Sequence, residues 1–207
     1  MKNYILVHTE TINFKKGWYL TSDGKRYGIK DAYGNLICPT IYSFISDFTD
    51  GLAVIKFKKN IFSKEQWGVM NEKFEVNLFS EEYKNVKVLN RKILAVQLED
   101  GEWRIIKKSG EKIPGPTYDE CPGPFSDGVA PVKCKKLYAF INEDGQQICK
   151  AIFSRYLYHD NGIFSVFAYT SDYYEPKYIF EGWGLGHEYR MTKKGVMLER
   201  GKNKYYM

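Results

Sequence analysis

The sequence predicts an all-β fold: tandem antiparallel β-hairpins or three-stranded meanders, with about four and a half copies of one unit. Three observations support this prediction. A short Asp-Gly motif recurs along the chain, an aromatic residue and a turn glycine keep a constant spacing, and the composition suits strands and tight turns. The 207 residues include 17 Tyr, 13 Phe and 18 Gly. Aromatic side chains favour half-buried pleated surfaces, and Asp-Gly pairs favour hairpin turns.

The recurring motif is clearest as Asp50-Gly51-Leu52-Ala53-Val54. It returns at residues 127–132 as Asp-Gly-Val-Ala-Pro-Val, more weakly at 161–166, and in degenerate form at 92–96. The anchor positions 51, 92, 128 and 162 are 41, 36 and 34 residues apart. A period of this size indicates repeated copies of one supersecondary unit. Such arrays usually provide binding or scaffolding surfaces rather than enzymes.

Each copy opens with an aromatic residue, and a turn glycine or its substitute follows seven residues later. The pairs are Tyr27 with Gly34, Trp67 with Phe74, Trp103 with Gly110, and Tyr138 with Gly145. We therefore expect residues 26–57, 102–134 and 137–167 to adopt the same strand-turn-strand unit, with their opening aromatics in equivalent places.

The middle of the unit repeats as well, because residues 34–43 match 145–154 at Gly, Ile, Cys, Ile and Ser without a gap. Together with Trp67-Gly68, which keeps an aromatic-glycine dipeptide in register, this consensus resembles the WG-repeat (KWG-repeat) family of bacterial β-repeat proteins. The resemblance covers about residues 26–166. It implies a β-repeat architecture and brings no catalytic residues to this chain.

We expect one repeat-array domain over residues 1–207. Strands at 4–8 and 17–20 precede the first copy, and the basic insert Lys58–Lys64 is expected to be a loop. The copies occupy about 26–65, 66–101, 102–136 and 137–167, and an atypical C-terminal unit at 168–207 caps the array. A propeller-like ring and an open solenoid both fit this pattern.

Several repeat positions are expected in the core. Trp67 and Trp103 are expected to pack between copies, because ring packing stabilises such junctions. Cys38 and Cys149 occupy the same slot between apolar neighbours. We therefore expect both thiols to be reduced and mostly buried, and neither to be a metal ligand.

Composition limits the partner classes. The net charge is +6 and the basic residues are dispersed, whereas nucleic-acid binders cluster them, so we expect no nucleic-acid partner. No stretch approaches the ~18 apolar residues of a membrane helix, and the N-terminal apolar run is too short for a signal peptide. We therefore expect no membrane partner and a cytoplasmic location.

The sequence offers little chemistry. The pair His159-Asp160 is typical of a polar turn. The glycines Gly182, Gly184 and Gly186 have neither the following helix nor the Lys and Ser or Thr of a phosphate loop. We expect no catalytic residue, no metal and no cofactor, and hence no enzyme. A Cys–His pair that meets only in space stays open.

The functional signal is aromatic and lies where the fourth unit departs from the others, at Tyr156, Tyr158, Tyr173 and Tyr174. Tyrosine is enriched at protein interfaces, while ordinary packing is the competing interpretation. The prediction is a non-catalytic protein-interaction module with its partner surface over residues 156–186. The alternative is a small-ligand or nucleotide-binding (sequestering) protein with a pocket in the array, and an enzyme ranks third. If these tyrosines are core, the loops of earlier copies become the candidates, beginning with Lys58–Lys64.

Overall fold

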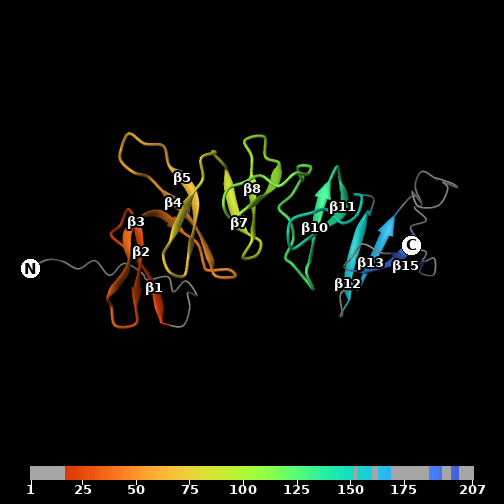
Figure 1. Cartoon of the computed structure of the whole chain (residues 1–207), viewed down its shortest axis with the longest axis horizontal. Coiled ribbons are helices and arrows are strands. Elements are labelled where there is room, and N and C mark those ends of the chain that lie inside the picture. Colours follow the sequence, from red (N-terminus) through yellow and green to blue (C-terminus); the bar gives the residue numbers. More distant parts are fainter. Residues whose placement is uncertain (1–16, 152, 160–162, 169–186, 193–196, 201–207) are drawn as a thin grey trace, which may run out of the picture. The chain divides into compact units, whose positions relative to one another are not determined.

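The computed structural model describes residues 17–151, 153–159, 163–168, 187–192 and 197–200 (Figure 1). These residues form fifteen β-strands and no helix, which confirms the predicted all-β class. The strand predicted at 17–20 is β1, and the one predicted at 4–8 lies outside the described residues. The strands are β1 (Trp18–Ser22), β2 (Tyr27–Asp31), β3 (Leu36–Ile45), β4 (Leu52–Phe57), β5 (Gln66–Asn71), β6 (Val76–Leu78), β7 (Asn85–Val88), β8 (Ile93–Gln97), β9 (Trp103–Lys107), β10 (Val129–Cys134), β11 (Leu137–Asn142), β12 (Arg155–His159), β13 (Ile163–Ala168), β14 (His187–Thr192) and β15 (Met197–Arg200).

The strands form four sheets in which sequence neighbours are also spatial neighbours. Their orders are β1-β2-β3-β4-β5-β6, β7-β8-β9, β10-β11 and β12-β13-β14-β15. The chain divides into two compact units. The first comprises Met1–Leu94 with Lys107–Glu111, and the second comprises Ala95–Ile106 with Lys112–Met207. Each unit has its own hydrophobic core.

The seven-residue spacing marks one recurring turn. The strand that carries the opening aromatic ends four residues after it, at Asp31, Asn71, Lys107 or Asn142. In all four copies the amide of the seventh residue donates to the carbonyl of that last strand residue at 2.9–3.0 Å. The seventh residue has a positive φ each time, 86° at Gly34, 63° at Phe74, 90° at Gly110 and 78° at Gly145. The four aromatics are therefore equivalent, as predicted.

An Asp or Asn side chain holds this turn in three copies. The Oδ1 atoms of Asp31, Asn71 and Asn142 each accept hydrogen bonds from the amides two and four residues later, at 2.8–3.1 Å. The side-chain amide of Asn35 also donates to Asp31, and this lowers the pKa of that carboxyl. Such Asx bonding stabilises a turn locally. It helps to hold Phe74 in a left-handed conformation that usually requires glycine.

The Asp-Gly motif forms a second recurring turn. Both central residues have positive φ, 50° and 79° at Asp50-Gly51, and 46° and 82° at Asp127-Gly128. The flanking residues exchange two backbone hydrogen bonds at 2.8–3.1 Å, Thr49 with Leu52 and Ser126 with Val129. Positive φ at both positions is the type I′ geometry that matches strand twist, so the motif marks a tight turn rather than a site.

Strand pairing joins one copy to the next. The last strand of copy one, β4, pairs with the first strand of copy two, β5, and β10 pairs with β11 in the same way between copies three and four. The registers correspond, because Ala53 lies opposite Met70 and Ala130 lies opposite Ile141. At these two junctions one sheet contains strands from both copies, so the boundaries of the sequence copies do not coincide with those of the sheets.

Glycine permits a close approach of strands at two of the opening dipeptides. A Cβ on Gly28 would lie 2.6 Å from the carbonyl oxygen of Cys38, and one on Gly68 would lie 2.5 Å from that of Asn77. Both distances are below van der Waals contact, so the glycine of the dipeptide lets the next strand lie against it.

The cores contain apolar residues of the strands. In the first unit the core contains Ile29, Cys38, Tyr42, Ile45, Ala53, Ile55 and Met70. In the second unit a core cluster contains Val129, Phe140, Phe153 and Val166, with Tyr138, Ile148, Cys149 and Tyr156 packed against it. Trp67 and Trp103 are buried, as expected for core aromatics. Removal of this apolar area from water is the main stabilising contribution.

Candidate functional site

The structure describes two of the four predicted partner-binding tyrosines, both on β12. Tyr156 is half-buried, and its ring makes T-shaped contacts with Tyr138 at 5.1 Å and Phe140 at 5.6 Å between ring centroids. Burial, with the nearby Tyr138, raises the pKa of Tyr156. Tyr158 lies opposite residue 164 in the β12–β13 ladder. Tyr173 and Tyr174 lie outside the described residues, and the binding role of all four stays a prediction.

The two cysteines of the shared slot are free thiols. Cys38 is fully buried, with its Sγ 3.7 Å from the Sδ of Met70, and Cys149 is half-buried against the core of the second unit. Burial raises the pKa of each thiol to about 11. Because the thiolate is the nucleophile, neither sulfur is activated near neutral pH.

Over the described ranges, no three or more His, Cys, Asp or Glu side chains gather as a metal site would require. No helix within those ranges is long and apolar enough to cross a membrane.

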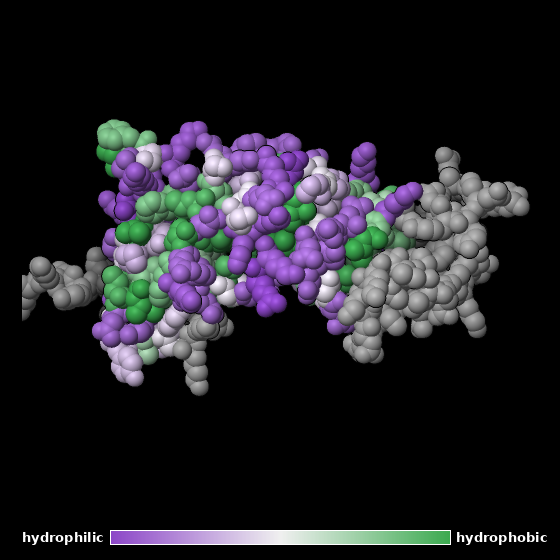
Figure 2. All heavy atoms as spheres, in the orientation of Figure 1, coloured by the Kyte–Doolittle hydropathy of each residue, from purple (hydrophilic) through white to green (hydrophobic). Residues whose placement is uncertain are grey.

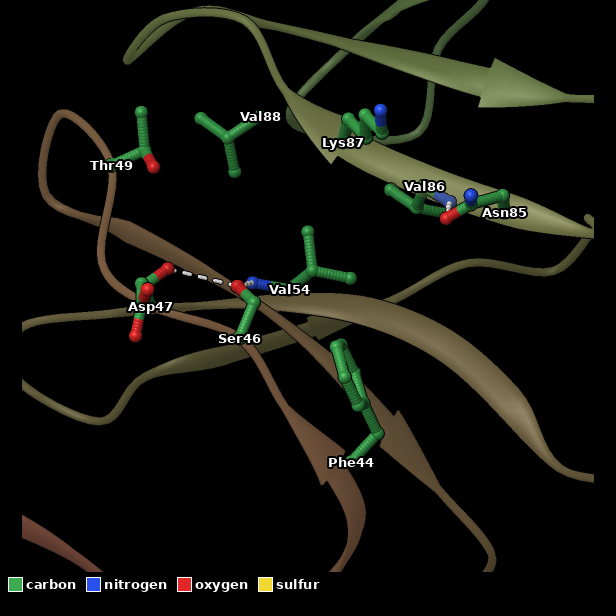
Figure 3. A pocket seen from close by; sticks show the side chains of 9 residues that line it. All are labelled: Phe44, Ser46, Asp47, Thr49, Val54, Asn85, Val86, Lys87 and Val88. Carbon is green, nitrogen blue, oxygen red and sulfur yellow. Dashed lines mark hydrogen bonds between the residues drawn. The ribbon is translucent and has the colours of Figure 1, made fainter. Parts of the chain in front are cut away.

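A groove in the first unit is a concave surface formed by described residues. It has a volume of about 360 Å³ and lies between the end of β3, the following turn, β4 and β7. Figure 3 shows the nine side chains that line it: Phe44, Ser46, Asp47, Thr49, Val54, Asn85, Val86, Lys87 and Val88. Val54 and Val86 are buried, whereas Asp47 and Lys87 are exposed. The groove therefore combines apolar side chains with charges of both signs.

Hydrogen bonds fix one wall of the groove. The amide of Ser46 donates to the carbonyl of Val54 at 2.8 Å, and the amide of Val54 donates to the Oγ of Ser46, also at 2.8 Å. The Ser46 hydroxyl donates in turn to the carbonyl of Asp47 at 2.8 Å. With its hydrogen-bonding capacity used by the backbone, Ser46 has a structural role rather than that of a nucleophile.

The opening tryptophan of copy two positions the aromatic wall. The ring of Phe44 meets the ring of Trp67 edge-to-face, with centroids 5.9 Å apart. Trp67 is itself held by a 2.6 Å hydrogen bond from its Nε1 to the carbonyl of Tyr83 and by Lys56, whose Nζ lies 4.3 Å from the ring centroid. Phe44 is 41% exposed. A structural residue of the repeat thus supports an aromatic side chain that faces solvent.

Strand β7 forms the other wall and is an edge strand of its sheet, with β8 as its neighbour in the part of the chain that the structure describes. An edge strand presents backbone N–H and C=O groups on one side. The groove therefore presents main-chain hydrogen-bonding groups, an aromatic side chain and two charged side chains, and all of these can contact a bound molecule.

Sequence reasoning missed this groove. Its walls come from residues 44–49 and 85–88, which are about one repeat length apart and meet only in the fold. The one available signal was that Phe44 stands exposed near the core tyrosine Tyr42, and that signal depends on knowing the strand register.

The family match and one solved structure support the fold, and no comparison identifies a ligand. The family model "WG containing repeat" matches residues 27–60 and 103–138, which confirms the resemblance. A crystal structure of a eukaryotic initiation factor matches with a TM-score of 0.54 at 10% identity, over 93% of this chain and 52% of that one. Hsv2 of Kluyveromyces lactis matches with a TM-score of 0.42 at 13% identity, over 91% of this chain and 61% of that one. This chain thus spans about half the length of the first structure. No curated protein matches the sequence.

Proposed function

Because this chain carries WG repeats, we propose that it is a non-catalytic protein-interaction module. We further propose that its partner presents an extended segment that pairs with the edge strand β7 in the groove. The observation that carries this proposal is the edge strand β7 lying beside an exposed aromatic wall. Addition of a strand to a sheet edge supplies affinity through main-chain hydrogen bonds, and flanking pockets supply specificity.

The lining residues suggest what the segment contains. Phe44 offers one ring face or edge to an apolar side chain, and Asp47 and Lys87 offer one charge of each sign to polar residues of the partner. Rim charges mainly set selectivity and association rate. A segment of alternating apolar and charged residues therefore fits the groove best, because alternate side chains of a strand point to opposite faces.

The alternative function, small-ligand binding, depends on the same groove. Its volume of about 360 Å³ falls at the lower end of the ~300–1,000 Å³ range of ligand pockets. An aromatic wall with a carboxylate and an ammonium group would suit a small zwitterion. We favour an extended segment because β7 is an edge strand, and an edge strand can pair with an added strand.

The test is a displayed peptide library selected on the full chain, followed by affinity measurement of the recovered peptides. We expect Asp47→Lys and Lys87→Glu each to raise Kd at least about fivefold, the scale of a ~1 kcal/mol rim charge contact. Lys108→Glu reverses an exposed charge outside the groove and is the matched control. Bound peptide should also slow hydrogen exchange at amides 85–88.

Two results would contradict the groove. The first is a peptide Kd that neither charge reversal changes. The second is hydrogen exchange at the β7 amides that saturating peptide does not slow. A further variant, Tyr173→Ala with Tyr174→Ala, tests the predicted tyrosine surface independently of the groove. If this double variant abolishes peptide binding while the groove variants do not, the partner surface lies within residues 156–186. Selection of a small molecule instead of any peptide would favour the alternative function.

A further inference from the structure

The loop between β4 and β5 presents two large apolar side chains to solvent. It covers residues 58–65, and within it Ile61 is 77% exposed and Phe62 is 92% exposed. In Figure 1 the loop is the orange one at the upper left, and Figure 2 shows hydrophobic residues gathered at its outer end beside hydrophilic ones. Two adjacent large apolar side chains exposed at one loop tip form a candidate interaction site.

The loop is ordered so that this tip points outward. The Oδ1 atom of Asn60 accepts hydrogen bonds from the amides of Phe62 and Ser63 at 3.0 and 2.9 Å, and from the Ser63 hydroxyl at 2.8 Å. This Asx turn holds the backbone around Ile61 and Phe62. The side chains are therefore presented on a preorganised turn.

Basic residues flank the apolar tip. Lys58 and Lys59 precede it, and Lys64 follows it. Lys64 pairs with Glu82 at 2.6 Å, and both of those side chains are exposed. Among the described residues, neither Lys58 nor Lys59 has a carboxylate within ion-pair distance. The loop thus combines two apolar side chains with two available positive charges.

The shape of the tip decides between a protein and a membrane as its partner. Even a large aromatic side chain buries only ~150–250 Å², so two side chains stay far below the ~1,200 Å² of a stable protein interface. A convex tip would also need a matching pocket on a protein. A lipid surface needs no shape match, because apolar side chains partition into the interface and nearby Lys residues attract anionic headgroups.

We propose that the β4–β5 loop is a peripheral membrane anchor that inserts Ile61 and Phe62 into an anionic lipid interface while Lys58 and Lys59 contact lipid phosphates. The expectation of no membrane partner was drawn from the absence of a spanning stretch. A loop that inserts two side chains needs no such stretch, so this proposal replaces that expectation. It is independent of the groove.

The test is co-sedimentation of the full chain with vesicles of phosphatidylcholine alone and of phosphatidylcholine with phosphatidylserine. Wild-type protein should sediment with the anionic vesicles and less with the neutral ones. Ile61→Ser with Phe62→Ser should lower the partition coefficient at least about tenfold, since each buried apolar side chain is worth on the order of 1.5 kcal/mol or more. Lys58→Glu with Lys59→Glu should lower it about tenfold or more, and added salt should weaken binding to anionic vesicles.

The matched control is Tyr33→Ser. Tyr33 is 91% exposed at the tip of the β2–β3 turn, so this variant removes a comparable exposed ring outside the loop and should leave partition unchanged. A second measurement is Phe62→Trp, whose added fluorescence should be quenched by brominated lipid beyond the wild-type level. Equal sedimentation of wild type and the Ile61/Phe62 variant would overturn the proposal, and so would failure of the wild type to bind anionic vesicles.

Discussion

The hairpin β4–β5 of the first unit and the hairpin β10–β11 of the second have the same register and different loops. Each joins the end of one copy to the start of the next, and their six pairs correspond one to one from Leu52↔Asn71 and Val129↔Asn142 onward. Residues 58–65 close the first hairpin, whereas Lys135 and Lys136 alone close the second. The strands therefore specify the pairing, and the connection is free to diverge.

Inside the two hairpins, different residues occupy equivalent cross-strand contacts. Lys56 lies opposite Trp67 with its Nζ 4.3 Å from the ring centroid, and Lys133 lies opposite Tyr138 at 5.7 Å. A lysine over an aromatic face is attracted by the ring quadrupole. Each lysine also contacts a glutamate, and the hydrogen bond to Glu120 raises the pKa of Lys133. The lysine–aromatic contact occurs in both hairpins and therefore belongs to the repeat. The long loop 58–65 occurs only in the first hairpin.

The largest expected effect is at the opening tryptophan. Trp67→Ala should lower the free energy of unfolding by ~3–5 kcal/mol, the range for loss of a large buried aromatic, and chemical denaturation measures it. Trp67→Phe keeps a ring but leaves the carbonyl of Tyr83 without its 2.6 Å donor, so it should cost ~1–3 kcal/mol. The equivalent Tyr138→Ala should cost less than Trp67→Ala, because Tyr138 is less buried. An unchanged midpoint for Trp67→Ala would show that this ring is not core.

The next effect concerns the short turn. Lys135 and Lys136 have φ of 49° and 70°, and the Asp119 carboxylate accepts from both of their amides, at 3.2 and 2.9 Å. Asp119→Ala should therefore cost ~1–3 kcal/mol, because it removes the acceptor that supports a left-handed non-glycine turn. Replacing both lysines with Asn-Gly, the residues that type I′ turns prefer, should make the Asp119 substitution less costly. Equal costs in both backgrounds would contradict this account.

A loop exchange gives a smaller effect of opposite sign. Replacing residues 58–65 with Asn-Gly gives β4–β5 the short connection of β10–β11. Loop closure costs ~0.6 kcal/mol per doubling of length, so the exchange should stabilise the protein by about 1 kcal/mol. The same variant should lose binding to anionic vesicles. Destabilisation by more than about 1 kcal/mol would mean that the long loop supports the fold.

The smallest effect at neutral pH involves the shared cysteine slot. Burial raises the pKa of Cys38 from about 9 to about 11, so the folded state holds this proton more tightly than the unfolded state does. The resulting stabilisation is complete below pH 9 and is lost as the pH rises from 9 towards 11. The thermal midpoint of the wild type should fall as the pH rises from 9 towards 11, and that of Cys38→Ala should fall less steeply. Rapid labelling of Cys38 in the folded state at pH 7 would contradict its burial.

The turns were predictable because they need particular backbone angles. The seven-residue spacing located all four positive-φ positions, including Phe74, which keeps the angle without being glycine. The pairing across copies could not be read in the same way, since a period reveals the length of a repeat but not its phase. Every cyclic permutation of the unit repeats equally well. Only the strand pairing in the structure, such as Ala53 opposite Met70, shows that a sheet continues across the copy boundary.

The binding surfaces were less predictable, because they depend on position in space. Phe44 and Lys87 line one groove although 43 residues separate them in the sequence. Lys58–Lys64 was predicted as a loop, and the structure confirms a loop there. The exposure of Ile61 and Phe62 could not be predicted, because apolar residues between lysines fit a buried strand equally well. Tyr156 shows the reverse, since a side chain selected for its divergence from the repeat packs on the core.

Pairing across copies also determines when each strand can be protected during synthesis. Strand β4 ends at Phe57, and its partner β5 is complete only at Asn71, 14 residues later. At a synthesis rate of ~5–20 residues per second, the apolar run 52–55 lacks its β5 partner for about 1–3 seconds. For strand β10 the corresponding interval is 8 residues, from its end at Cys134 to the end of its partner β11 at Asn142. The long loop therefore lengthens the interval in which a nascent apolar strand is open to a chaperone or to aggregation.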